Sequence, residues 1–135
     1  MDLGTKTIGL AISDAEWRFA GPDIVVRRRK LADDLEAVGA RLSAYQVRGL
    51  VVGLPLNMDG TPGASAQRSR AFARTLEGAF GLPVLLWDES LTSVAAEEAM
   101  FAAGIPRARW AEKIDAHAAA IILQNAIDWF ARERR

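Results

Sequence analysis

Cysteine is absent from the 135 residues of this chain, and histidine occurs once, as His117. Without cysteine the chain can form no disulfide, no thiolate nucleophile and no cysteine-ligated zinc site. A single histidine also excludes a metal site built from several imidazoles. Any metal site is therefore expected to use oxygen ligands.

Long apolar runs are missing as well. No stretch approaches the ~20 residues that a membrane span needs, and no signal-peptide pattern precedes the first apolar segment. We therefore expect a cytoplasmic protein with no membrane partner. The length fits a single domain, residues 1–135, and the 50% of hydrophobic residues are enough for a buried core.

An excess of charge of one sign is also lacking, because 17 basic residues balance 17 acidic ones. The protein is therefore not a polycation overall. The cations are nevertheless clustered, and the four clusters comprise residues 27–30, then Arg68, Arg70 and Arg74, then Arg107, Arg109 and Lys113, and last Arg132, Arg134 and Arg135. Each cluster alone fits a solvated surface, but together they leave binding of a polyanion open.

The spacing of apolar residues and turn formers predicts a mixed α/β fold. The first half reads as an antiparallel meander, and the second half alternates strand and helix. We therefore expect one five-stranded mixed sheet with helices on both faces. The expected strands cover residues 7–13, 24–27, 49–54 and 84–87 after a first strand that holds Asp2, and the expected helices cover 31–45, 65–80, 92–103 and 111–134.

Acidic residues at three separated places are candidates for one site. Asp2 precedes an apolar strand, where a buried carboxylate needs a partner. Asp88 and Glu89 follow the strand at 84–87, at the edge where ligands collect in open α/β sheets. Strand alternation shows only that these two neighbours point to opposite faces.

The third acid, Asp115, starts an otherwise apolar stripe on the last helix. The stripe should face the sheet, so Asp115 is expected to point inward near the start of the helix. Its members at helical spacing are Asp115, Ala119, Ile122, Ala126 and Trp129.

Converging carboxylates repel one another, and a divalent cation offsets that repulsion. Oxygen ligands favour Mg²⁺ or Mn²⁺ over Zn²⁺. Two such ions held by shared carboxylates can hydrolyse a phosphodiester. Each acid alone also has an ordinary explanation, such as solvation for Asp2 or the helix dipole for Asp115. The joint pattern favours a functional site.

Four segments of the chain resemble the bacterial YqgF/RuvX family, which is RNase H-like. They are the opening Asp-Leu-Gly-Thr-Lys-Thr-Ile-Gly at residues 2–9, the loop at 51–61, the acidic strand end at 88–93 and the helix at 114–124. Proteins of this family are described as pre-16S rRNA nucleases or Holliday junction resolvases. The resemblance implies an RNase H-like domain that cleaves nucleic acid, with processing of the 5′ end of pre-16S rRNA in ribosome biogenesis as the expected role.

The resemblance also implies roles for individual residues. Asp2, Glu89 and Asp115 occupy the acidic positions expected to be catalytic and to bind Mg²⁺ or Mn²⁺. Glu89 is selected over Asp88 by the family pattern alone. The residues expected to contact the nucleic acid are Lys6, Asn57, Arg68, Arg70, Arg107 and Arg109.

The start of the chain departs from the family pattern. Family members usually carry several mostly apolar residues before the position of Asp2, whereas only Met1 precedes it here. The resemblance therefore implies a truncated first strand. Because fewer sheet hydrogen bonds would then hold Asp2, we expect weakened metal binding or stability.

Other functions remain open from the sequence. A Holliday junction resolvase would use the same carboxylates, so structured RNA and branched DNA are both possible substrates. A resolvase usually acts as a symmetric dimer, which leaves a monomer or a homodimer open. The segment at 2–7 also resembles the phosphate loop of actin-like kinases and ATPases, but those enzymes need two lobes and this chain has the length of one. A non-catalytic RNA-binding module is the remaining alternative.

Overall fold

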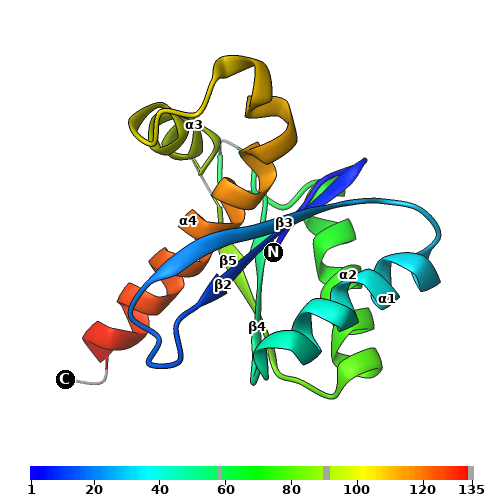
Figure 1. Cartoon of the computed structure of the whole chain (residues 1–135). Coiled ribbons are helices and arrows are strands. Elements are labelled where there is room, and N and C mark those ends of the chain that lie inside the picture. The colour runs from blue at the N-terminus through cyan, green and yellow to red at the C-terminus, as the bar shows by residue number, and fades with distance from the viewer. Residues whose placement is uncertain (58, 90–91, 134–135) are drawn as a thin grey trace.

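The computed structural model follows the predicted order of strands and helices and describes residues 1–57, 59–89 and 92–133 (Figure 1). The strands are β1 (Asp2–Leu3), β2 (Thr7–Ser13), β3 (Ala20–Arg27), β4 (Leu50–Leu54) and β5 (Val84–Asp88). The helices are α1 (Leu31–Tyr45), α2 (Ala64–Phe80), α3 (Thr92–Ala102), the 3-10 helix η1 (Arg107–Arg109) and α4 (Trp110–Glu133).

The strands form two small sheets, so the predicted single five-stranded sheet is wrong. One sheet holds β1, β2 and β3 in antiparallel order, and the other pairs β4 with β5 in parallel. The antiparallel first half and the parallel second half are confirmed. β1 has two residues and forms its ladder with β2 rather than with β4. Two hydrogen bonds of Met1 link the two sheets, from its amine to the Val51 carbonyl (2.6 Å) and from the Gly53 N–H to its carbonyl (2.9 Å).

One face of the sheets packs against α1 and α2, which lie together on one side in Figure 1. Ile8 of β2, Val52 of β4, Val38 of α1 and Leu76 of α2 are completely buried in this core. Full burial of such a side chain contributes about 1.5–3 kcal/mol. The long-range contacts among these four segments therefore hold the two sheets and the two helices together.

The opposite face of β2 and β3 is covered by α4, as the expectation of helices on both faces requires (Figure 1). Ala119, Ile122 and Ala126 are buried, which confirms that the predicted stripe faces the sheets. Trp129, the last member of the predicted stripe, is 40% exposed, so the stripe is not buried along its whole length. It lies near the end of the helix, where its ring packs edge-to-face on Trp87 with 6.0 Å between centroids.

The backbone of α4 rests directly on Gly9 of β2. A Cβ atom at Gly9 would lie 2.8 Å from the backbone nitrogen of Ala116 and closer still to the carbonyl group of Asp115. Real Cβ atoms are not found at such distances from backbone atoms, so only glycine permits this crossing. The close approach fixes the helix against the strand at Asp115.

The last helix is the longest, at 24 residues, and its predicted last residue, Arg134, lies outside the described residues. A helix of this length is long enough to cross a bilayer, so whether it can do so depends on its hydropathy. Within residues 1–57, 59–89 and 92–133, no helix combines the length and the apolar character that crossing a membrane requires.

We predict that Gly9→Ala destabilises the protein by at least about 2 kcal/mol, because the new methyl group overlaps the backbone of α4 rather than a movable side chain. Urea unfolding measures the change. Gly21→Ala in β3 is the matched control, since a Cβ there meets no atom within 4 Å. Equal stability of the two variants would show that α4 does not rest on Gly9 as described.

Candidate active site

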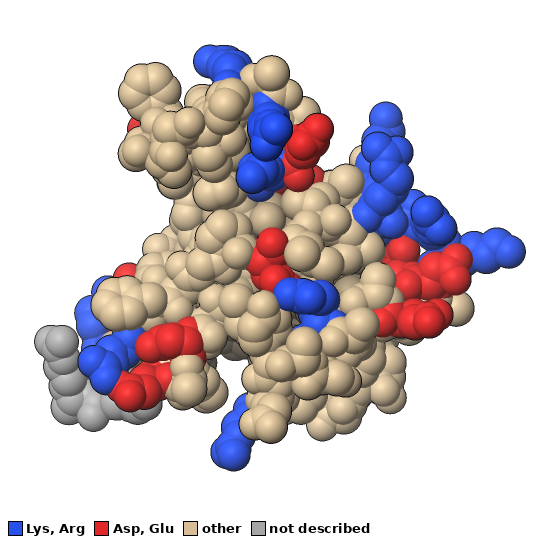
Figure 2. Space-filling view, viewed as in Figure 1, with Lys and Arg blue, Asp and Glu red and all other residues tan. Residues whose placement is uncertain are grey.

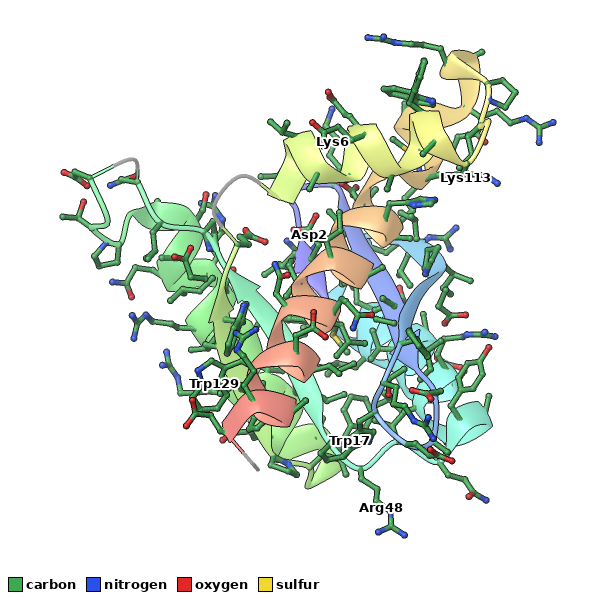
Figure 3. The ribbon with its side chains drawn as sticks, turned by 90° about the vertical axis from the view of Figure 1, so that its left-hand side faces the viewer. Asp2, Lys6, Trp17, Arg48, Lys113 and Trp129 are labelled. Atoms are coloured by element: carbon green, nitrogen blue, oxygen red, sulfur yellow. The ribbon has the colours of Figure 1, made fainter. Side chains whose placement is uncertain are left out.

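Asp2 of β1 is the acid around which the site is arranged. In the antiparallel ladder its Cα partner is Gly9, the residue on which α4 rests. Asp2 is therefore held beside the start of α4, as its position in Figure 3 shows. Burial raises the pKa of the Asp2 carboxyl, and the negative charge of Asp115 raises it further.

Glu89 reaches Asp2 from the residue after β5. Its carboxyl group donates a hydrogen bond to the Asp2 carboxylate, which requires the two groups to share a proton. Burial, then the charge of Asp2 and this hydrogen bond, raise the pKa of Glu89 to about 8. Asp88, its neighbour, is exposed. The structure thus brings Glu89 against Asp2, which the alternation of the strand alone did not decide.

Asp115 completes the trio from the second turn of α4. It is half-buried, and Oδ2 of its carboxylate accepts a hydrogen bond from the Thr7 hydroxyl. Its charge acts on Asp2, so the two carboxylates are electrostatic neighbours. Two acids, Glu89 after β5 and Asp115 of α4, therefore lie close to Asp2 of β1.

A second glycine makes room for one of these acids. A Cβ atom at Gly53 of β4 would lie 2.7 Å from Cδ1 of Ile122 and closer still to Oε2 of Glu89. Both atoms are the ends of flexible side chains, so a larger residue would displace them without moving a backbone. Gly53 thus sets where the Glu89 carboxylate lies.

The donor set suits a hard divalent cation, since three carboxylates supply oxygen ligands and negative charge. The pKa values of Asp2 and Glu89 are raised by burial and by the neighbouring carboxylates, which outweigh the attraction of the terminal amine, so a divalent cation would favour the ionised forms. Among the described residues, no three acidic or histidine side chains are already spaced as ligands of one ion. A hydrogen bond joins the Asp2 and Glu89 carboxyl groups, and a bound cation would have to replace its proton.

Lys6 lies on the exposed turn between β1 and β2, at the same end of the molecule as Asp2 and Lys113 (Figure 3). The turn is braced, because the Arg28 guanidinium donates to the Gly4 carbonyl (2.8 Å) and the Arg28 N–H donates to the Lys6 carbonyl (2.8 Å). Lys6 is therefore an exposed cation on a fixed backbone at the same end of the molecule as Asp2.

Basic side chains also lie toward this end of the molecule. Figure 2 shows Lys and Arg over η1 and the start of α4, and again over the connections that follow β1 and β3. In η1, Arg107 and Arg109 are exposed, and the Arg107 guanidinium lies over the Trp110 ring, 4.7 Å from its centroid. Trp110 is itself fixed by donating from its indole to the Ile105 carbonyl (2.9 Å). Arg107 and Arg109 thus stand on an ordered segment that leads into α4.

The remaining predicted contacts lie in and after the loop between β4 and α2. The Asn57 amide donates to the Thr61 hydroxyl (3.1 Å) and lies against Gly63, so it orders the loop itself. Arg68 donates to the Ser65 hydroxyl (2.9 Å), and Arg70 is exposed. These contacts of Asn57 and Arg68 do not involve the three acids, and a role in binding substrate stays a prediction for all three residues.

Sequence reasoning missed three residues that shape the site, namely Thr7, Gly9 and Gly53. A glycine inside an apolar strand often marks a close approach of another backbone or side chain, and both glycines carry this signal. Thr7 had no signal of its own, because its partner Asp115 is 108 residues away in sequence.

We predict that, without divalent cations, the free energy of unfolding is lowered progressively as the pH rises from 4.5 to about 8, the range between the ordinary and the raised pKa of Glu89. In this range the native state binds more protons than the unfolded state, so raising the pH favours unfolding. Urea unfolding in EDTA at several pH values tests this. Glu89→Gln should lose this part of the pH dependence; a constant difference in stability between the two proteins across the range would contradict it.

Comparison with known proteins identifies the family of the chain. The RuvX family model, described as Holliday junction resolvase, matches residues 1–129. A protein of Sphingopyxis alaskensis named "Putative pre-16S rRNA nuclease" is 54% identical over 132 residues, 98% of this chain and 86% of that protein. A Novosphingobium aromaticivorans protein of the same name is 53% identical over 131 residues, 97% of this chain and 84% of that protein. The resemblance seen in the motifs is thus confirmed, and the chain belongs to the RuvX (YqgF) family.

Proposed function

We propose that this protein is a metal-dependent endonuclease that hydrolyses phosphodiester bonds of RNA and processes the 5′ end of pre-16S rRNA. The observation that carries the proposal is the meeting of Asp2, Glu89 and Asp115, which come from three distant segments. The names of the relatives that are 53% and 54% identical support RNA as the substrate.

Asp2, Glu89 and Asp115 would hold Mg²⁺ or Mn²⁺. When bound, the cation lowers the pKa of a water molecule and stabilises the charge that develops on the phosphate. The protein contributes the rest of the site. Burial of the carboxylates strengthens their electrostatic interaction with a cation, and the packing of α4 on Gly9 keeps Asp2 and Asp115 together.

The surrounding cations would hold the nucleic acid. Lys6 lies on the braced turn at the end of the molecule that holds Asp2, and Arg107 and Arg109 directly precede α4, so these cations would contact phosphates near the scissile bond. Such contacts position the backbone without reading its sequence. The net charge of zero fits this arrangement, because the attraction needed is confined to one end of the molecule.

Resolution of Holliday junctions is the second candidate, and the description of the matching family model favours it. A resolvase makes two symmetric cuts, so it needs two active sites related by a twofold axis. The three acids would carry the same chemistry in either case. Substrate preference and oligomeric state in solution separate the two candidates.

We predict that the protein cleaves labelled precursor 16S rRNA in the presence of Mn²⁺ and that Asp2→Asn, Glu89→Gln and Asp115→Asn each reduce the rate by at least about 100-fold. Substituting a residue that hydrogen-bonds to a metal ligand typically reduces metal affinity or activity about 10–100-fold, and substituting a ligand itself should reduce it more. Asp33→Asn on the exposed first turn of α1 is the matched control and should cleave normally. Preference for a four-way DNA junction by a dimer would establish the second candidate, and binding of RNA without cleavage would establish a non-catalytic module.

We also predict that Lys6→Ala weakens RNA binding about tenfold, as expected for loss of one charged hydrogen bond to phosphate. The slope of log affinity against log salt should fall by about 0.7–0.9 for this single contact. Binding is measured by fluorescence anisotropy in Ca²⁺ or with Asp115→Asn to prevent cleavage. Arg48→Ala is the control, because Arg48 lies at the opposite end of the molecule (Figure 3). An equal effect of both substitutions would point to non-specific attraction.

A further inference from the structure

A hydroxyl group reaches one of the three acids from the neighbouring strand. Thr7 begins β2, and its Oγ1 donates to Oδ2 of Asp115. Thr7 and Gly9 are two residues apart and so share a face of β2, the face that α4 crosses. The strand β2 therefore contacts α4 twice. Gly9 lies against the helix backbone, and Thr7, two residues earlier, contacts the Asp115 side chain.

We propose that Thr7 is a positioning residue that holds the Asp115 carboxylate in the orientation needed to bind a divalent cation. The inference rests on the proposed function, because it assigns Thr7 a role at the metal site proposed there. A carboxylate that accepts a hydrogen bond at one oxygen cannot rotate freely, so its conformation is fixed before a cation arrives.

The electrostatics of the site show why such a bond is needed. The charge of Asp115 raises the pKa of Asp2, so the two carboxylates repel each other. Asp115 is only half-buried, and an unrestrained side chain could turn toward solvent to relieve the repulsion. The Thr7 hydroxyl is a donor on the strand side that opposes this movement and keeps the carboxylate near Asp2.

The bond also differs from the other hydroxyl contact of the same strand. Ser13, at the far end of β2, donates to the carbonyl of its neighbour Asp14 (3.0 Å) and so stabilises a local turn. Thr7 instead joins β2 to α4 across 108 positions of sequence and ends on a candidate metal ligand. Threonine also suits a strand, so the hydroxyl is gained without loss of β propensity.

The test is the affinity for Mn²⁺, measured by isothermal titration calorimetry on the intact chain. Thr7→Ala and Thr7→Ser differ from each other only by the hydroxyl group. We expect Thr7→Ser to stay within about threefold of the unaltered protein and Thr7→Ala to bind about 10–100-fold more weakly, the usual effect of losing an outer-shell partner. Thr75→Ala is the control for hydroxyl loss elsewhere, since Thr75 donates to the Ala71 carbonyl on α2, and it should bind normally.

The outcomes separate this inference from the proposed function. Absence of Mn²⁺ binding by the unaltered protein would overturn both. Equal affinities of Thr7→Ala and Thr7→Ser, in a protein that does bind Mn²⁺, would overturn the role of Thr7 alone. In an Asp115→Asn background Thr7→Ala should cause no further loss, and a full additional loss would also overturn it. If Thr7→Ala does not fold, the near-isosteric Thr7→Val replaces it in the same comparison with Thr7→Ser.

Discussion

The contact between Gly9 and the backbone of α4 is the constraint on which both the fold and the candidate site depend. It lets the last helix lie directly on β2, with small residues such as Ala119 buried beneath it. Gly9 is also the cross-strand partner of Asp2, and the atoms it touches belong to Asp115. One crossing therefore brings together two acids that are separated by most of the chain, and it does so through backbone atoms, which cannot move aside as side chains do.

Bringing the acids together is electrostatically unfavourable, and the effect is seen at Asp2 and Glu89. Burial raises the pKa of both Asp2 and Glu89, which share a proton. A site of this kind opposes stability in its ionised form, and natural proteins usually accept such conflicts at functional positions. A ligand that binds the folded state alone offsets the conflict by mass action, so cation binding and folding are expected to be coupled. The supporting contacts, from the Thr7 hydroxyl to the fit of Gly53 against Glu89, are the means by which the acids stay together.

Much of this arrangement was predictable from the sequence, because the spacing of apolar residues indicates which face of a helix or strand is buried. The inward stripe of α4 placed Asp115 correctly, and the apolar strand at β5 placed the acidic pair at its end. The single five-stranded sheet was not realised, because a ladder depends on how many residues pair, which composition does not reveal. Strand alternation could not choose between Asp88 and Glu89, and only the family resemblance selected Glu89, because the side of β5 that meets Asp2 depends on the three-dimensional arrangement. Trp129 was misplaced because helical spacing does not show where the sheet beneath the helix ends.

The direction of α4 explains why the two ends of the molecule differ. Asp115 lies near the start of the helix and Trp129 near its end, 14 positions later and about 21 Å away at 1.5 Å per residue. The acids and Lys6 therefore share one end, and the exposed aromatic rings of Trp17 and Trp129 lie at the other (Figure 3). Attraction for a polyanion falls off over about 8–10 Å at physiological salt. Among the described cations, those at the end that holds the acids are within reach of the proposed nucleic-acid site, so the proposal is compatible with a net charge of zero.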